Sequence, residues 1–178
     1  MKPIYFVFLW LIVIAGITGF VLLSEPPIGA SGMAHESIQS MSVGGDGAAR
    51  LSAIGDAPFY FQITVILLAV SLLYMGVAEH RRDTRFRLFM AGGAAFALFV
   101  WYKLYTGYEA FLLTGETDVV FGFPVPTNWM LWGVWGSFAI FDLMFVFFFR
   151  IYFWPKEDEA AFEALVAELK AAKKAGDA

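Results

Sequence analysis

The sequence predicts an all-α integral membrane protein, with a four-helix transmembrane bundle and a short cytoplasmic amphipathic helix. Of its 178 residues, 60% are hydrophobic and only 16% are charged, and the mean hydropathy is +0.68. This composition lies well outside the range of ordinary soluble proteins. The apolar residues gather in four runs of about 20 residues or more, which is the length that crosses a hydrocarbon core of about 30 Å as a helix.

The four runs predict one transmembrane domain, 1–155, with helices at about 4–23, 59–78, 88–113 and 129–154. None shows the alternation of apolar and polar residues that a membrane β-strand requires, and all are too long for one strand. The first run also resembles a secretory signal, with small residues near Ile28–Ala30 as a cleavage point. Its length exceeds the roughly 7–15 residues of a signal core and two prolines follow it, which favours a retained helix.

The placement of Lys and Arg predicts that both ends of the chain lie in the cytoplasm. Arg50 falls on the outer side and Lys103 lies within the third run. The other ten of the 12 basic residues fall on the opposite side: Lys2, Arg81, Arg82, Arg85, Arg87, Arg150, Lys156, Lys170, Lys173 and Lys174. The positive-inside rule therefore places the termini and the short 79–87 loop in the cytoplasm.

Two segments are then expected outside the membrane. Segment 24–57 is rich in Gly, Ser, Ala and Met and has no core of its own. A loop of this length is uncommon in a compact unit, so we expect it to be mobile or, preferably, to lie on a partner. The second segment ends in 121–128, where alternating prolines force an extended path before Thr127 or Asn128 caps the fourth helix.

Three tryptophans recur at every third position near the outer end of the fourth helix: Trp129, Trp132 and Trp135. This spacing predicts that they share one side of the helix. Tryptophan is enriched at both membrane surfaces, so an interfacial aromatic belt is the ordinary interpretation. A quinone or lipid pocket is the alternative.

Segment 156–178 predicts a cytoplasmic amphipathic helix. Acidic residues at its start and lysines at its end complement the helix dipole. One narrow apolar stripe follows helical spacing: Phe162, Leu165, Val166 and Leu169. The 79–87 loop offers almost no apolar surface to cover this stripe, so we expect it to dock on a partner chain or on the membrane surface.

Two ionisable residues fall inside the predicted helices, where charges are costly and often functional. Counting from the predicted inner helix ends, Lys103 and Asp142 lie at similar depths. The sequence therefore predicts an ion pair that joins the third and fourth helices. The alternatives are a proton or ion relay, and an arrangement in which Lys103 extends outward while Asp142 faces a neighbouring subunit.

The sequence gives little support for a metal or a cofactor. The absence of cysteine excludes membrane thiol oxidoreductases, and neither of the two histidines lies inside a predicted helix, which argues against an intrinsic bis-histidine haem. Met33, His35 and Met41 in the first outer loop form a weak candidate site for a soft metal such as copper. We expect no cofactor held by this chain alone.

The function expected from these features is that of a non-catalytic accessory subunit of a larger bacterial inner-membrane complex. Its partners would be a larger integral membrane subunit and lipid, not nucleic acid. The layout of four short-looped helices with a Gly-Phe-Pro turn before the last resembles the small membrane subunits of multicomponent secondary transporters; an energy-converting enzyme is the other expected setting. The alternatives are a homo-oligomeric transporter or channel using Asp142 and Lys103, and a subunit that contributes to a metal or quinone site of a membrane oxidase or monooxygenase.

Overall fold

The computed structural model describes the whole chain except residues 1, 26, 28–31, 46 and 177–178, so the cleavage point considered at 28–30 lies outside the described residues. Its four long helices are each apolar enough to cross a membrane. They are α1 (Pro3–Leu23), α3 (Ala57–Met75), α4 (Thr84–Thr114) and a composite fourth helix over Val125–Phe147. The prediction of a mostly helical protein with four helices long and apolar enough to span a membrane is confirmed.

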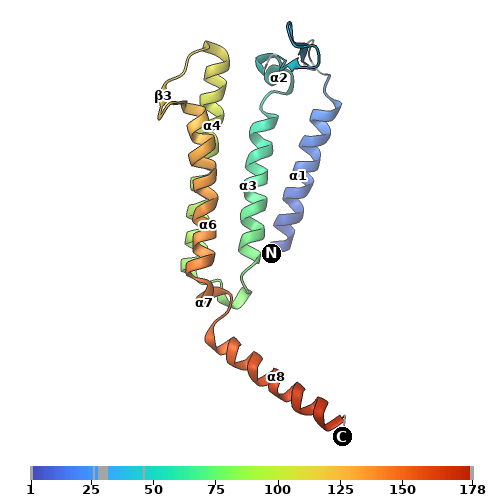
Figure 1. Ribbon diagram of the computed structural model, residues 1–178, viewed down its shortest axis with the longest axis vertical. Coiled ribbons are helices and arrows are strands. Elements are labelled where there is room, and N and C mark those ends of the chain that lie inside the picture. Colours follow the sequence, from blue (N-terminus) through green and yellow to red (C-terminus); the bar gives the residue numbers. More distant parts are fainter. Residues whose placement is uncertain (1, 26, 28–31, 46, 177–178) are drawn as a thin grey trace.

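The helices form a row rather than a closed bundle (Figure 1). The principal packing joins neighbours in the chain: α1 with α3, α3 with α4, and α4 with the fourth helix. The N-terminus, the α3–α4 link and the C-terminal helix lie at one end, which we call the tail end. The opposite end carries the two long connections and is called the loop end.

Helices α3 and α4 differ from the predicted boundaries because polar residues near their ends decide where they stop and start. The α3 helix ends at Met75, three residues earlier than expected, and a 3₁₀ turn (Glu79–Arg81) forms the link. The α4 helix starts at Thr84 instead of residue 88, because the Asp83 carboxylate accepts the Phe86 N–H at 2.8 Å and caps it. Gly115, with φ of 71°, ends α4 in the left-handed conformation.

The fourth helix departs most from its predicted range of 129–154. It begins with α5 (Val125–Asn128), where Pro124 is the N-cap residue and Thr127 and Asn128 are already helical, so the predicted caps are wrong. A π-helical segment (Trp129–Val134) follows, and then α6 (Trp135–Phe147). Phe148 leaves the helical conformation, and a short helix α7 (Phe149–Tyr152) lies beyond it. The membrane-crossing segment is therefore displaced toward the loop end.

The long connections contain small elements of their own. Strands β1 (Met33–Ala34) and β2 (Ser42–Val43) pair as a hairpin, and helix α2 (Gly47–Ile54) contacts α4. The 24–57 segment thus rests partly on its own chain. In the second connection, β3 (Val119–Val120) and β4 (Phe123–Pro124) form a hairpin. The Asn128 amide donates to the carbonyls of Val120 and Phe123 and so fastens this hairpin to α5.

The most deeply buried cluster lies at the tail end, mostly between α4 and the α6–α7 segment. Val77, Phe86, Met90, Phe141, Met144 and Tyr152 form it. Gly93 allows α4 and α6 to approach closely, because a Cβ atom at this position would come within 2.6 Å of the Phe141 ring. The final helix α8 (Lys156–Gly176) projects from this end, away from the row (Figure 1).

Candidate functional site

The ionisable residue Asp142 lies on the outer side of α6. Its neighbours Phe141 and Met144 turn inward and are buried against α4. Asp142 itself is exposed, and so are Ala139 and Val146 on the same helix face. The Asp142 carboxylate makes no hydrogen bond or ion pair with any other residue that the structure describes.

Asp142 lies toward the tail end of the row, measured along the helix axes. The adjacent Phe141 ring packs at Gly93 of α4. Ala91 and Ala94, on either side of Gly93, line a groove with Ser71 of α3 and Trp10 of α1. At 1.5 Å per residue, α1 is about 31 Å long, and Trp10 lies roughly 10 Å from its tail-end terminus at Pro3. Asp142 is five residues, about 8 Å, from the end of α6 at Phe147, so a membrane crossed by these helices would place it in the third of the hydrocarbon core nearest the tail end.

Lys103 lies at a different level, close to the loop end. Trp101, two residues before it, donates its indole N–H to the Phe59 carbonyl at 3.1 Å, in the first turn of α3. Because Val100 packs at Gly133, where α4 contacts the π-helical segment, Lys103 is level with about Met130. Twelve residues separate this level from Asp142, a distance of about 18 Å along the helix.

The structure therefore does not bring Lys103 and Asp142 together. Both side chains are exposed, and no ion pair joins them in the described chain. The similar depth expected from the sequence was wrong because it was counted from Trp154, whereas α6 ends at Phe147. The remaining arrangement considered above, with Lys103 extending toward the membrane surface and Asp142 facing a neighbour, agrees with these positions.

The three tryptophans do not share one helix face. Trp129 is half-buried and packs edge-on against Phe99, with ring centroids 5.8 Å apart. Trp132 and Trp135 are 67% and 75% exposed. The π-helical segment has a wider turn than an α-helix, so a three-residue spacing no longer keeps side chains aligned. An interfacial belt stays a prediction for the two exposed rings.

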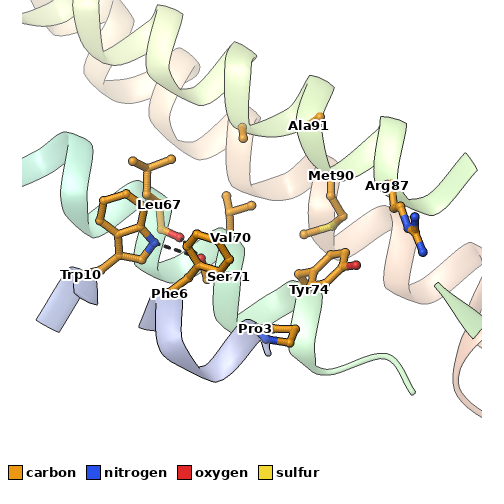
Figure 2. Close-up of a pocket in the computed structure, with 11 residues that line it drawn as sticks. Pro3, Phe6, Trp10, Leu67, Val70, Ser71, Tyr74, Arg87, Met90 and Ala91 are labelled. Atoms are coloured by element: carbon orange, nitrogen blue, oxygen red, sulfur yellow. Dashed lines mark hydrogen bonds between the residues drawn. The ribbon is translucent and has the colours of Figure 1, made fainter. Parts of the chain in front are cut away.

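A shallow groove of about 430 Å³ runs along α1, α3 and α4 toward the tail end. Figure 2 shows Phe6 and Trp10 of α1 beside Val70 of α3, with the Trp10 indole donating to the Ser71 hydroxyl at 3.2 Å. Arg87 of α4 is the charged residue of the lining. The groove is otherwise almost entirely apolar, which suits a lipid chain or an apolar side chain and offers no acid–base pair.

The tail end holds α8 through contacts confined to its first two turns. The Arg81 guanidinium donates to the Phe153 carbonyl at 3.0 Å and forms an ion pair with Asp158. Arg150 pairs with Glu159 at 2.6 Å. Sequence reasoning missed both pairs, although the acidic start of the tail and the arginines that precede it provided a signal.

The apolar stripe of α8 is left largely uncovered beyond this anchor. Phe162 meets Trp154 edge-on, with ring centroids 5.9 Å apart. It is nevertheless 54% exposed, and Leu165 and Leu169 are 52% and 61% exposed, whereas Val166 is partly covered. The helix therefore does not fold its stripe against the α3–α4 link. Docking on a partner or a membrane surface stays a prediction.

A second anchor at the tail end joins α7 to the start of α4. The Tyr152 hydroxyl donates to the Asp83 carboxylate at 3.1 Å, and this same carboxylate caps α4. Burial, with a further contribution from this hydrogen bond and the Asp83 charge, raises the pKa of Tyr152 above its ordinary value. This contact fixes the bend after α6, from which α8 departs.

The weak metal candidates lie in and beside the β1–β2 hairpin. The His35 N–H donates to the Met41 carbonyl at 2.8 Å, and Nδ1 of His35 accepts the Ser37 N–H at 3.2 Å. The Met41 side chain is exposed, and the side chain of Met33 lies outside the described part. No cluster of three or more His, Asp or Glu residues suited to a metal occurs in the described chain. The copper hypothesis thus gains no support.

The features that stand out are therefore an unpaired acid on the outer face of α6 and an uncovered stripe on α8. Searches against protein families, curated proteins and solved structures find no match to this chain.

Proposed function

We propose that the chain is a non-catalytic accessory subunit of a larger complex in a bacterial cytoplasmic membrane, either a multicomponent transporter or an energy-converting enzyme. The observation that carries this proposal is the uncovered apolar stripe of α8. Phe162, Leu165 and Leu169 are each more than half exposed on a helix that projects from the tail end. Adjacent exposed apolar residues of this kind are typical of interaction surfaces.

The anchor of α8 supports a docking role over that of a loose tail. Ion pairs at Asp158 and Glu159 hold the first turns of the helix against the tail end. The rest of the helix is free to meet another surface at a fixed position. The positive-inside rule assigns this end to the cytoplasm, so the partner surface would be cytoplasmic.

The open row of helices adds further support. The long helices expose many large apolar side chains, and the described residues form no cluster of acids and histidines suited to a metal. Lys103 and Asp142 do not form an ion pair within the described chain, and a homo-oligomeric transporter or channel that uses them stays the alternative. In a subunit that packs beside a larger membrane protein, exposed apolar side chains of this kind form the contact between the two proteins.

The test replaces Leu165 and Leu169 by Asp and examines the native complex by blue-native electrophoresis after mild detergent extraction. The wild-type chain is expected to migrate within a larger complex, and the variant to leave it while still inserting in the membrane. A matched control places Asp at Ala164 and Ala167, which are exposed away from the stripe. If the wild-type chain migrates alone in several mild detergents, the proposal fails.

A further inference from the structure

The outer face of α6 carries an acidic side chain for which the described part of the chain supplies no hydrogen-bond or ion-pair partner. Asp142 is exposed within the membrane-crossing segment, about 8 Å from its tail-end terminus at Phe147, with Ala139 and Val146 beside it on the same face. A carboxylate that faces lipid at this depth is costly, and intramembrane acids almost always face protein or water and pair with another group. A partner for Asp142 must therefore come from outside the chain.

The nearby basic residues of the same chain do not supply this partner, and Arg150, eight residues beyond Asp142, is paired with Glu159. Lys103 is about 18 Å away along the axis. Arg85 and Arg87 lie in the first turn of α4, and helical side chains lean toward the N-terminus, which here points to the tail end and away from Asp142.

Lys103 of a second copy of the chain does not supply it either. Membrane oligomers that are symmetric about the membrane normal keep every residue at the same depth in each copy. Lys103 of a second copy would therefore lie as far from Asp142, measured along the axis, as Lys103 of the first.

We propose that the outer face of α6 binds a transmembrane helix of a different protein, and that this helix carries a Lys, Arg or His at the level of Asp142. The proposal rests on the accessory-subunit function and specifies the chemistry of the partner. Charge complementarity selects a basic residue, because it would satisfy the carboxylate where water is excluded.

The surface around Asp142 accommodates a helix. A Cβ atom at Gly136 would meet nothing within 4 Å, and the exposed Ala139 lies between Gly136 and Asp142. Small residues let another backbone approach closely in lipid. Leu143 and Val146, which are 52% and 71% exposed, provide apolar contact on either side.

The experiment places a photo-crosslinking amino acid at Ala139 in the full chain, expressed in its native membrane. The control carries the same probe at Ile12, an exposed residue of α1 at a comparable level. We expect a heteromeric adduct from Ala139 that is absent from Ile12, and mass spectrometry should locate a basic residue in the crosslinked helix. Asp142→Asn should reduce the adduct roughly tenfold, because it leaves the partner's charge unpaired, whereas Asp142→Glu should retain most of it.

A compensating change makes the test independent of folding. Replacing the partner's basic residue by Met in the Asp142→Asn background should restore the adduct, since no lone charge then remains. An adduct unaffected by Asp142→Asn, one formed only with a second copy, or no adduct at Ala139 would overturn the inference. If blue-native electrophoresis still shows the larger complex in those cases, the accessory role survives and only the α6 interface is rejected.

Discussion

Lys103 and Asp142 lie on different helices, about 18 Å apart along the axis, so their contributions to folding should be independent. We expect the combined effect of Lys103→Met and Asp142→Asn on the free energy of unfolding to equal the sum of the single effects within about 0.5 kcal/mol. Unfolding in detergent, followed for both single variants and the double variant, measures the coupling. A double variant clearly more stable than this sum would show that the charges interact.

Tyr152 connects the bend after α6 to the cap of α4, which makes the tail end sensitive to alkaline pH. Its raised pKa means that the unfolded chain loses the phenolic proton at lower pH than the folded chain. The stability contributed by this contact is therefore complete below the ordinary tyrosine pKa of about 10 and is lost as pH rises through the folded pKa.

Thermal unfolding across this pH range should show the loss in the wild-type protein and a weaker dependence in Tyr152→Phe. Phenolate absorbance, compared between the two proteins, isolates the titration of this one side chain. Tyr5, whose ring is exposed, provides the control as Tyr5→Phe. Equal pH profiles for wild type and Tyr152→Phe would mean that the hydrogen bond to Asp83 does not contribute.

At the scale of the helices, Gly92 and Gly93 provide a matched pair of adjacent positions. A Cβ atom at Gly93 would come within 2.6 Å of the buried Phe141 ring, whereas one at Gly92 would meet nothing within 4 Å. We expect Gly93→Ala to cost about 1–3 kcal/mol through overpacking, and Gly92→Ala to be neutral or slightly stabilising. Detergent unfolding of both variants, with Phe141→Leu tested for rescue of Gly93→Ala, measures the difference. Equal stability would contradict the close α4–α6 approach.

The helices themselves could be predicted from hydropathy, but their ends could not always be. Residues 148–154 are apolar apart from Arg150 and Tyr152, so composition gives little sign that Phe148 leaves the helix. The end of α6 is instead fixed by tertiary contacts such as that of Tyr152 with Asp83. This single boundary error moved the expected depth of Asp142 by about 10 Å and created the apparent pairing with Lys103.

The candidate site was predictable in its parts and not in its arrangement. Asp142 and the α8 stripe were evident from the sequence, because one is an acid in an apolar run and the other follows helical spacing. The anchoring pair of Arg81 and Asp158 depends on the angle at which α8 leaves the tail end. Such an angle is set by packing around Tyr152 and Phe153 and has no local sequence signature.

At the scale of the whole molecule, the open row explains why so few side chains are deeply buried. Each long helix packs mainly on its chain neighbours, and the most buried cluster gathers at the tail end. The two outward features, the α6 face and the α8 stripe, lie on different surfaces. A partner that engaged both would contact the membrane part and the projecting helix together, which would increase the effective affinity of each contact.

At the scale of the whole molecule, we predict that both ends of the chain lie on the same side of the membrane. Arginines of the α3–α4 link and Arg150 lie at the tail end, and the positive-inside rule assigns this end to the cytoplasm. The chain has no cysteine, so single introduced cysteines report unambiguously. Cysteines at Ser40 and Glu116, both exposed at the loop end, should react with a membrane-impermeant thiol reagent in intact cells.

A cysteine at Thr84, which is exposed at the tail end, should react only after the cells are permeabilised. The same is expected at Ala167 on α8, which extends the test from the link to the projecting helix. Permeabilised cells also serve as the control that each cysteine is accessible. Labelling of Thr84 and Ala167 in intact cells, with Ser40 protected, would invert the topology. Because the α8 stripe would then face away from the cytoplasm, that result would also require its partner to lie outside.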